Sequence, residues 1–243
     1  MRSLTVWVTP FTPVGSLAEA IDTTKALASS AGNGWAPSLL LPTHFGQWPQ
    51  AECRQSLPPD MLVGAPDDVV PIRSAVEAAG VGFGSWGVPV DLASPELAAE
   101  FARRSGYYAN NIEPGVFWTP GDDPAAVDAW WQAYWDTLGN DAEMLSGNTV
   151  ATVIPNTWGL DAFANSLPNI AAGCGALAAE VYGGINTSAS YPSPNLWPTP
   201  AFARLRATGV DANLIPILAR DNLSSQISQA NRLGHGNVHV WAC

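Results

Sequence analysis

The sequence predicts a single (β/α)8 barrel, the TIM-barrel arrangement of the α/β class, as one domain over residues 1–243. Short apolar runs typical of buried strands alternate with helix-like stretches, and a length of 243 residues matches one such barrel. In this fold the active site lies at the carboxyl ends of the strands. The eight expected strands are Leu4–Val8, Ala36–Leu41, Val81–Val88, Tyr107–Ile112, Thr149–Ile154, Leu177–Tyr182, Leu214–Ala219 and Val238–Trp241.

A glycine stands between the preceding helix-like stretch and each strand after the first. Glycine readily adopts the left-handed conformation that ends a helix, so each of these glycines is expected to stop one. The glycines are Gly32, Gly80, Gly106, Gly139, Gly173 or Gly175, Gly209 and Gly234.

Several helices also carry start signals. Ser94-Pro95-Glu96 offers a serine cap, a proline at the first helical position and an acid in the first turn. Asp123-Pro124 repeats this device before a helix expected over Ala125–Leu138. The last helix follows Asp221-Asn222 and should bury one face, formed by Leu223, Ile227 and Ala230.

Two long loops are expected over the carboxyl-terminal face of the barrel. The first, residues 42–70, contains the apolar triplet Met61–Val63, which we place in the loop because no capped helix precedes it. The second, residues 186–200, is rich in serine and proline. Loops of this length in a compact domain are usually functional or mobile.

The composition excludes several classes of partner. The net charge is −11, with 21 acidic against 10 basic residues, which argues against nucleic acid or an anionic membrane as partner. No run approaches the ~20 apolar residues of a spanning helix, and the first residues do not form a signal peptide. We therefore expect a cytoplasmic protein or a virion component. The three cysteines are odd in number and far apart, so free thiols are expected.

No cofactor and no metal are predicted. The glycines of Gly80–Gly87 have the wrong spacing for a dinucleotide fingerprint, and no P-loop, G-x-S-x-G elbow or zinc pattern occurs. The three histidines fall on distant segments, which disfavours a metal-dependent hydrolase. His239, on the inner face of the last strand, is expected to be a core histidine.

The fourth strand carries the first candidate for chemistry. Alternation along a strand puts Ala109, Asn111 and Glu113 on one face, and Glu113 falls at the carboxyl end. A carboxylate there is either a general acid or base at the barrel mouth, or a strand-end residue that binds backbone amides.

The sixth strand carries the second candidate. Alternation assigns Glu180 and Tyr182 to the inner face, with Tyr182 one layer nearer the mouth. Because a bare buried charge is costly, Glu180 is either the second member of a catalytic pair or a structural acid tied to Arg220 or His239.

The eleven tryptophans suggest a sugar ligand, since flat aromatic faces stack on pyranose rings. The alternative is that many of them fill the core, which we expect for Trp7 and Trp35. The tryptophans placed at the mouth are Trp86, Trp118, Trp158 and Trp241, and Asn156 is a further polar residue at a strand end.

Four short motifs carry a family resemblance. They are Ser85-Trp86-Gly87, an acid after the Gly106-Tyr107 start of the fourth strand, Glu180-Val181-Tyr182, and Val240-Trp241-Ala242. Together they resemble the glycoside-hydrolase-like TIM barrels that occur as uncharacterised bacterial proteins and as modules of phage tails and lysins. The resemblance covers most of the chain and implies that the fourth-strand acid, Glu113, is the proton donor.

The sequence thus predicts a glycoside hydrolase acting on a cell-wall or surface polysaccharide through two carboxylates. Glu113 would protonate the leaving oxygen and Glu180 would act as base or nucleophile, while Tyr182, Asn111 and Asn156 join the tryptophans in holding the sugar. The alternative is a non-catalytic carbohydrate-binding or structural module, for example a phage tail protein with virion or homo-oligomer contacts. The missing glutamate on the seventh strand and a charged content of only 13% favour that alternative.

Overall fold

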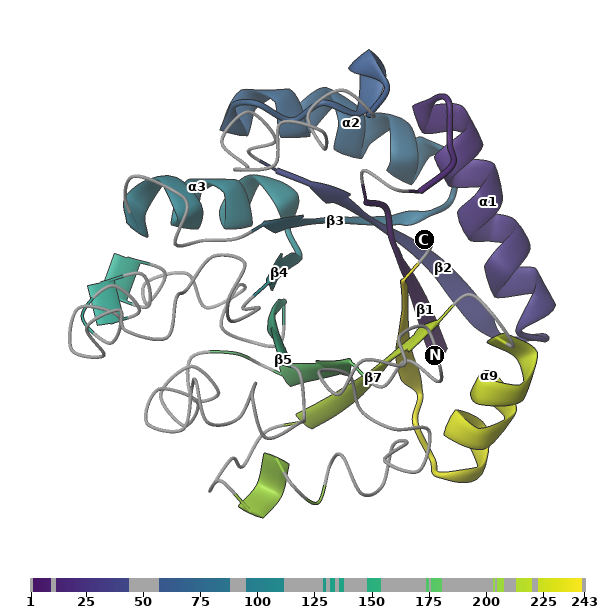
Figure 1. The fold of residues 1–243 in the computed structure, drawn as a ribbon. Coiled ribbons are helices and arrows are strands. Elements are labelled where there is room, and N and C mark those ends of the chain that lie inside the picture. Colours follow the sequence, from purple (N-terminus) through teal and green to yellow (C-terminus); the bar gives the residue numbers. More distant parts are fainter. Residues whose placement is uncertain are drawn as a thin grey trace.

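The computed structural model describes the chain at residues 2–9, 12–43, 57–87, 95–111, 148–153, 176–180, 213–219 and 223–241, and at a few positions between 129 and 207. Eight parallel strands form a closed barrel in the order of the sequence. Figure 1 looks along this ring, with α1, α2, α3 and α9 outside it. The prediction of a single (β/α)8 barrel is confirmed.

All eight predicted strands form, and their described bounds differ from the predicted ones by at most two residues. Their inter-strand pairing is parallel throughout, as a barrel of this class requires. The strands are β1 (Arg2–Trp7), β2 (Trp35–Pro42), β3 (Gly82–Gly87), β4 (Tyr108–Asn110), β5 (Thr149–Val153), β6 (Ala176–Glu180), β7 (Asn213–Ala219) and β8 (Asn237–Trp241).

The helices begin and end where their sequence signals stand. Helix α1 (Leu17–Ser30) starts after Ser16, whose hydroxyl accepts a hydrogen bond from the Glu19 N–H. Helix α3 (Pro95–Ser105) starts at its predicted proline, and α9 (Leu223–Arg232) buries the three predicted apolar residues. Four predicted stop glycines take a positive φ, namely Gly32, Gly80, Gly106 and Gly234. The other predicted stops, and most of the helix expected over Ala125–Leu138, lie outside the described residues.

The first long connection ends earlier than predicted. Helix α2 (Pro66–Ala78) begins four residues before Val70. Its N-terminus is fixed by the Asp68 carboxylate, which accepts hydrogen bonds from the N–H groups of Gly64 and Ala65. Within the predicted loop a short 3-10 turn, η3 (Pro59–Met61), is followed by Val63, which forms an isolated parallel bridge with Thr43. None of the helices in the described ranges combines the length and apolar character needed to cross a membrane.

The strand register determines which side chains fill the barrel. Thr5 is paired with Ser38 and Trp7 with Leu40, and the same face continues through Gly84 of β3. Large and small residues complement one another there. A Cβ added to Gly84 would lie 2.6 Å from Leu40 Cδ2 and 2.8 Å from the Tyr107 carbonyl oxygen. The interior is therefore packed by its own side chains, as is usual for this fold.

Candidate active site

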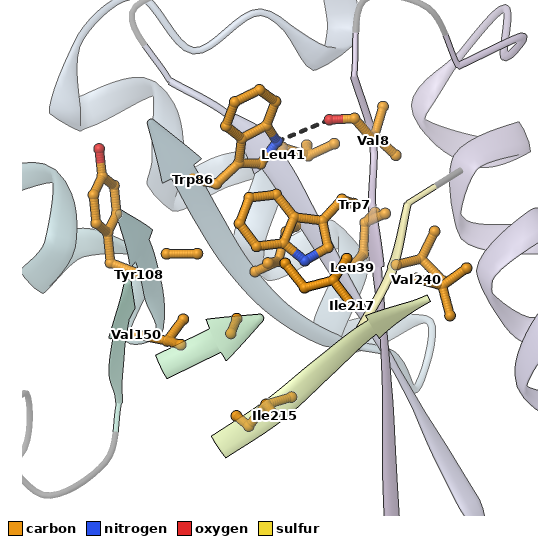
Figure 2. Packing of buried hydrophobic residues seen from close by; sticks show 14 of the residues in the cluster. Trp7, Val8, Leu39, Leu41, Trp86, Tyr108, Val150, Ile215, Ile217 and Val240 are labelled. Carbon is orange, nitrogen blue, oxygen red and sulfur yellow. Dashed lines mark hydrogen bonds between the residues drawn. The ribbon is translucent and has the colours of Figure 1, made fainter. Parts of the chain in front are cut away.

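The carboxyl end of the barrel is apolar on the side of β1, β3 and β8. Trp7, Trp86 and Trp241 pack together there with ring centroids 5.5 to 6.0 Å apart, and we call them the indole cluster. Trp7 and Trp86 are fully buried, whereas Trp241 is half-buried. The Trp86 N–H donates a 2.8 Å hydrogen bond to the Val8 carbonyl, drawn as a dashed line in Figure 2. Tilted indoles at these separations are in favourable contact, so the cluster closes this side of the mouth.

Beneath the indole cluster lies a buried histidine. The Trp7 N–H donates a 3.0 Å hydrogen bond to His239 Nδ1, and the Tyr107 hydroxyl lies 3.2 Å from His239 Nε2. Burial lowers the pKa of His239 to about 3, so the ring is neutral at pH 7. Burial also raises the pKa of Tyr107, with a smaller contribution from Cys174, so its hydroxyl stays protonated. The prediction of a core histidine is confirmed, because both ring nitrogens have a partner.

The other side of the mouth is polar. Asn111 follows directly after β4, and its N–H donates a 2.8 Å hydrogen bond to the Gly87 carbonyl, which continues the β3–β4 pairing. The Thr152 hydroxyl of β5 donates a 2.7 Å hydrogen bond to Asn111 Oδ1. Both side chains are buried, and we call them the amide–hydroxyl pair. Because the amide oxygen faces Thr152, the orientation of the amide is fixed.

A third polar group joins the ends of β2, β3 and β4 outside the barrel interior. The Thr43 hydroxyl donates to the Trp86 carbonyl at 3.1 Å and lies 3.1 Å from the Tyr108 hydroxyl. Since Thr43 has one hydroxyl proton, Tyr108 is the donor in the second bond. Gly87 makes this approach feasible, because an added Cβ would meet the Tyr108 hydroxyl and lie 2.6 Å from Thr43 Oγ1. These bonds hold the strand ends at a fixed spacing.

The predicted catalytic residues are only partly described. Glu180 is the last residue of β6, and its backbone is paired with Ile217 of β7. Two residues earlier, Ala178 is paired with Thr152, so β6 continues the wall that carries the amide–hydroxyl pair. Outside the described residues lie Glu113, Tyr182, Asn156, Trp118 and Trp158.

Two predicted sugar-binding tryptophans fall in the indole cluster. Trp86 has no exposed surface, and its rings contact Trp7 and Trp241. Trp241 retains some exposure at the end of β8. Within the described part of the chain, the indole rings at the mouth contact mainly one another.

The sequence reasoning missed Thr152 and Tyr107. The alternation on β5 places Thr152 on the same face as Val150, which is paired with Ala109 of β4. A polar residue at that inner position was the available signal. Tyr107 precedes β4 by one residue, and its partner His239 lies 132 residues away, so only the closed barrel brings the two together.

No group of three or more His, Cys, Asp or Glu side chains that would hold a metal ion occurs among the residues the structure describes. The polar groups at the described mouth are instead an amide and hydroxyls, which are neutral hydrogen-bonding groups.

Comparison with known proteins gives a fold but no family. No family model and no curated protein matches the chain. A crystal structure of an HpcH/Hpal aldolase/citrate lyase family protein from Burkholderia cenocepacia is similar, with a TM-score of 0.51 and 15% identity, over 99% of this chain and 88% of that one. The tryptophan synthase alpha chain from Legionella pneumophila is similar at a TM-score of 0.46 and 12% identity, over 99% of this chain and 79% of that one. At 15% identity the first similarity supports the barrel fold alone, and the second, with a TM-score below 0.5, carries no argument.

The predicted function is corrected by these findings. The resemblance to glycoside-hydrolase-like barrels is right for the barrel and wrong for the family, since the structure it is similar to is an aldolase/citrate lyase family barrel. The prediction of glycosidic hydrolysis on a polysaccharide is therefore wrong, and so is the alternative of a carbohydrate-binding or phage-tail module. The physical reason is that tryptophan content does not imply a sugar site. Trp7 and Trp86 bury their faces in the indole cluster.

Proposed function

We propose that this chain is an enzyme of the aldol-type lyase class, acting on a small oxygen-rich substrate at the carboxyl ends of β4, β5 and β6. The observation that carries the proposal is the buried 2.7 Å hydrogen bond from Thr152 to Asn111, at the end of the barrel where this fold places its active sites. The choice of reaction class rests on fold-level analogy to the aldolase/citrate lyase family barrel.

Asn111 supplies the electrophilic group. In aldol cleavage of a β-hydroxy carbonyl compound, the electrons of the breaking carbon–carbon bond move onto the carbonyl oxygen and form an enolate. An amide N–H directed at that oxygen stabilises the developing charge, and one such donor in other enzymes contributes about 3–4 kcal/mol. Thr152 holds the amide oxygen, so the Asn111 NH2 group is directed away from β5. This fixed orientation avoids reorganisation during the reaction.

Glu180 supplies the base. It is the last residue of β6, the strand that pairs with β5, which carries Thr152. Its carboxylate takes the proton from the β-hydroxyl group, the carbon–carbon bond breaks, and an aldehyde or ketone leaves. Glu180 then returns the proton to the enolate carbon, so atoms and charge balance.

The test is a cleavage assay on a panel of small β-hydroxy ketones and β-hydroxy acids, with release of the carbonyl product as readout. The variants are Glu180→Gln and Asn111→Ala, and the matched control is Glu96→Gln on the exposed first turn of α3. We expect Glu180→Gln to lower the rate by at least ~100-fold, as is usual for loss of a general base, and Glu96→Gln to have no effect. Cleavage of no panel member, or equal rates for the two glutamine variants, would contradict the proposal.

A further inference from the structure

A line of side chains crosses the barrel interior and ends at the indole cluster. It runs from Tyr107 before β4, through His239 of β8, to Trp7 of β1. Trp7 in turn contacts Trp86 at 5.5 Å and Trp241 at 5.8 Å between ring centroids. The proposed chemistry does not use any of these three interior residues.

The hydrogen bonds fix the tautomer of His239. An indole N–H is a donor only, so His239 Nδ1 must accept and carries no proton. The neutral ring then carries its proton on Nε2, and the Tyr107 oxygen accepts it at 3.2 Å. His239 consequently presents one acceptor and one donor in fixed directions, and a ring flip would replace the Nδ1 acceptor by the Cδ2–H group and leave the Trp7 N–H without this partner.

Trp7 links the orientation of the His239 ring to the side chains at the barrel mouth. It is fully buried, and its ring centroid lies 5.8 Å from that of His239. Trp86 is anchored separately, because its N–H is bonded to the Val8 carbonyl, while the Val8 N–H is bonded to Leu40. A rotation of Trp7 would therefore press against Trp86 or open a gap beside Trp241.

We infer that His239 is a positioning residue, which sets the indole cluster at the barrel mouth through its hydrogen bond to Trp7. The inference rests on the proposed function only in that the cluster forms the apolar wall of the proposed site. Its structural part is that His239 sets the positions of the Trp86 and Trp241 rings, and this part does not depend on any catalytic activity.

Two substitutions separate positioning from simple stabilisation. In His239→Asn the amide reaches the position of Nδ1 and retains an acceptor for Trp7, but it loses the contact with Tyr107. In His239→Gln the longer amide reaches the position of Nε2 and retains the Tyr107 contact, but it loses the acceptor for Trp7. Each variant thus keeps one of the two hydrogen bonds.

The readouts are the indole N–H resonances in proton–nitrogen correlation spectra, assigned by single Trp→Phe variants, and the KM and kcat of the lyase assay. We expect His239→Asn to leave the Trp86 and Trp241 resonances in place and His239→Gln to shift both. Where cleavage is measurable, His239→Gln should lower kcat/KM at least ~10-fold through KM, and His239→Asn should restore it. Equal behaviour of the two variants would overturn positioning, since a purely structural histidine loses one bond in either case.

Failure of the proposed function is distinguishable from failure of this inference. If the protein cleaves nothing, the indole resonances still decide whether His239 controls the cluster. If neither variant folds, the nitrogen shifts of the wild-type His239 ring decide it. An unprotonated, hydrogen-bonded Nδ1 supports the inference, and a proton on Nδ1 at neutral pH overturns it.

Discussion

The Thr152 hydroxyl and the Asn111 amide oxygen are joined by a 2.7 Å hydrogen bond between the ends of β5 and β4. Both residues are buried, so the bond forms away from bulk water and orients the amide at the barrel mouth. A buried pair of this kind has a measurable effect on stability and, in the proposed reaction, on catalysis.

Replacing Thr152 by Val tests this pair. Valine keeps the shape of threonine but removes the donor, so Asn111 Oδ1 loses this partner, at a cost of about 1 kcal/mol in the free energy of unfolding. Urea denaturation measures the cost. The control is Thr24→Val in α1, where the hydroxyl donates to the Ala20 carbonyl at 2.8 Å, a group that also accepts a helical N–H. A loss no larger at Thr152 than at Thr24 would count against the oriented pair.

Replacing Gly87 by Ala tests the packing of the strand ends. The new Cβ would meet the Tyr108 hydroxyl and lie 2.6 Å from Thr43 Oγ1, so we expect a loss of roughly 1–3 kcal/mol in the free energy of unfolding. Adding Tyr108→Phe removes the colliding oxygen and should recover part of the loss. Gly236→Ala is the control, because nothing lies within 4 Å of a Cβ added there. If the two alanine variants have the same stability, the close approach at Gly87 is not as described.

His239 should make stability fall as the solution becomes acidic. Its pKa is lowered by burial to about 3 in the folded state, against an ordinary value of 6.5. Between these values the unfolded chain binds a proton that the folded chain does not, so the free energy of unfolding decreases by about 1.4 kcal/mol for each unit that the pH falls. Above pH 6.5 the contribution is fully present.

Denaturation of wild type and His239→Asn between pH 7 and pH 4 measures this contribution. The difference between the two slopes isolates His239 from the carboxylates and from His235, whose pKa is also lowered by burial. Identical slopes would mean that His239 takes up a proton as readily when folded as when unfolded.

The fold was predictable because its signals are local. Gly80 and Gly106 end helices through a backbone conformation that needs no distant partner, and both take positive φ. Pro95 starts α3 by the same kind of local preference. The connection after β2 was misjudged, since α2 starts at Pro66 after a helix start signal that carries no serine or threonine.

The site was less predictable because it depends on the register between strands and on how deeply each side chain is buried. Alternation correctly assigned Asn111 and His239 to the inner face, but their partners Thr152 and Tyr107 are set by the alignment of strands distant in sequence. Alternation also does not tell whether an inner tryptophan lines a cavity or fills it. Trp86 was expected to stack on a sugar, and it lies buried in the indole cluster.

The most direct test of the central claim is deuterium exchange by proton NMR, with small ketones and oxo acids in D2O. If the ends of β4, β5 and β6 form and stabilise an enolate, the wild type will exchange the proton on the carbon next to the carbonyl group. The exchange rate of Glu180→Gln will then be at least ~100-fold lower than that of the wild type, and Glu96→Gln will exchange at the wild-type rate. Exchange that is absent from the wild type, or that survives in Glu180→Gln, would contradict a carbon–carbon lyase site at this end of the barrel.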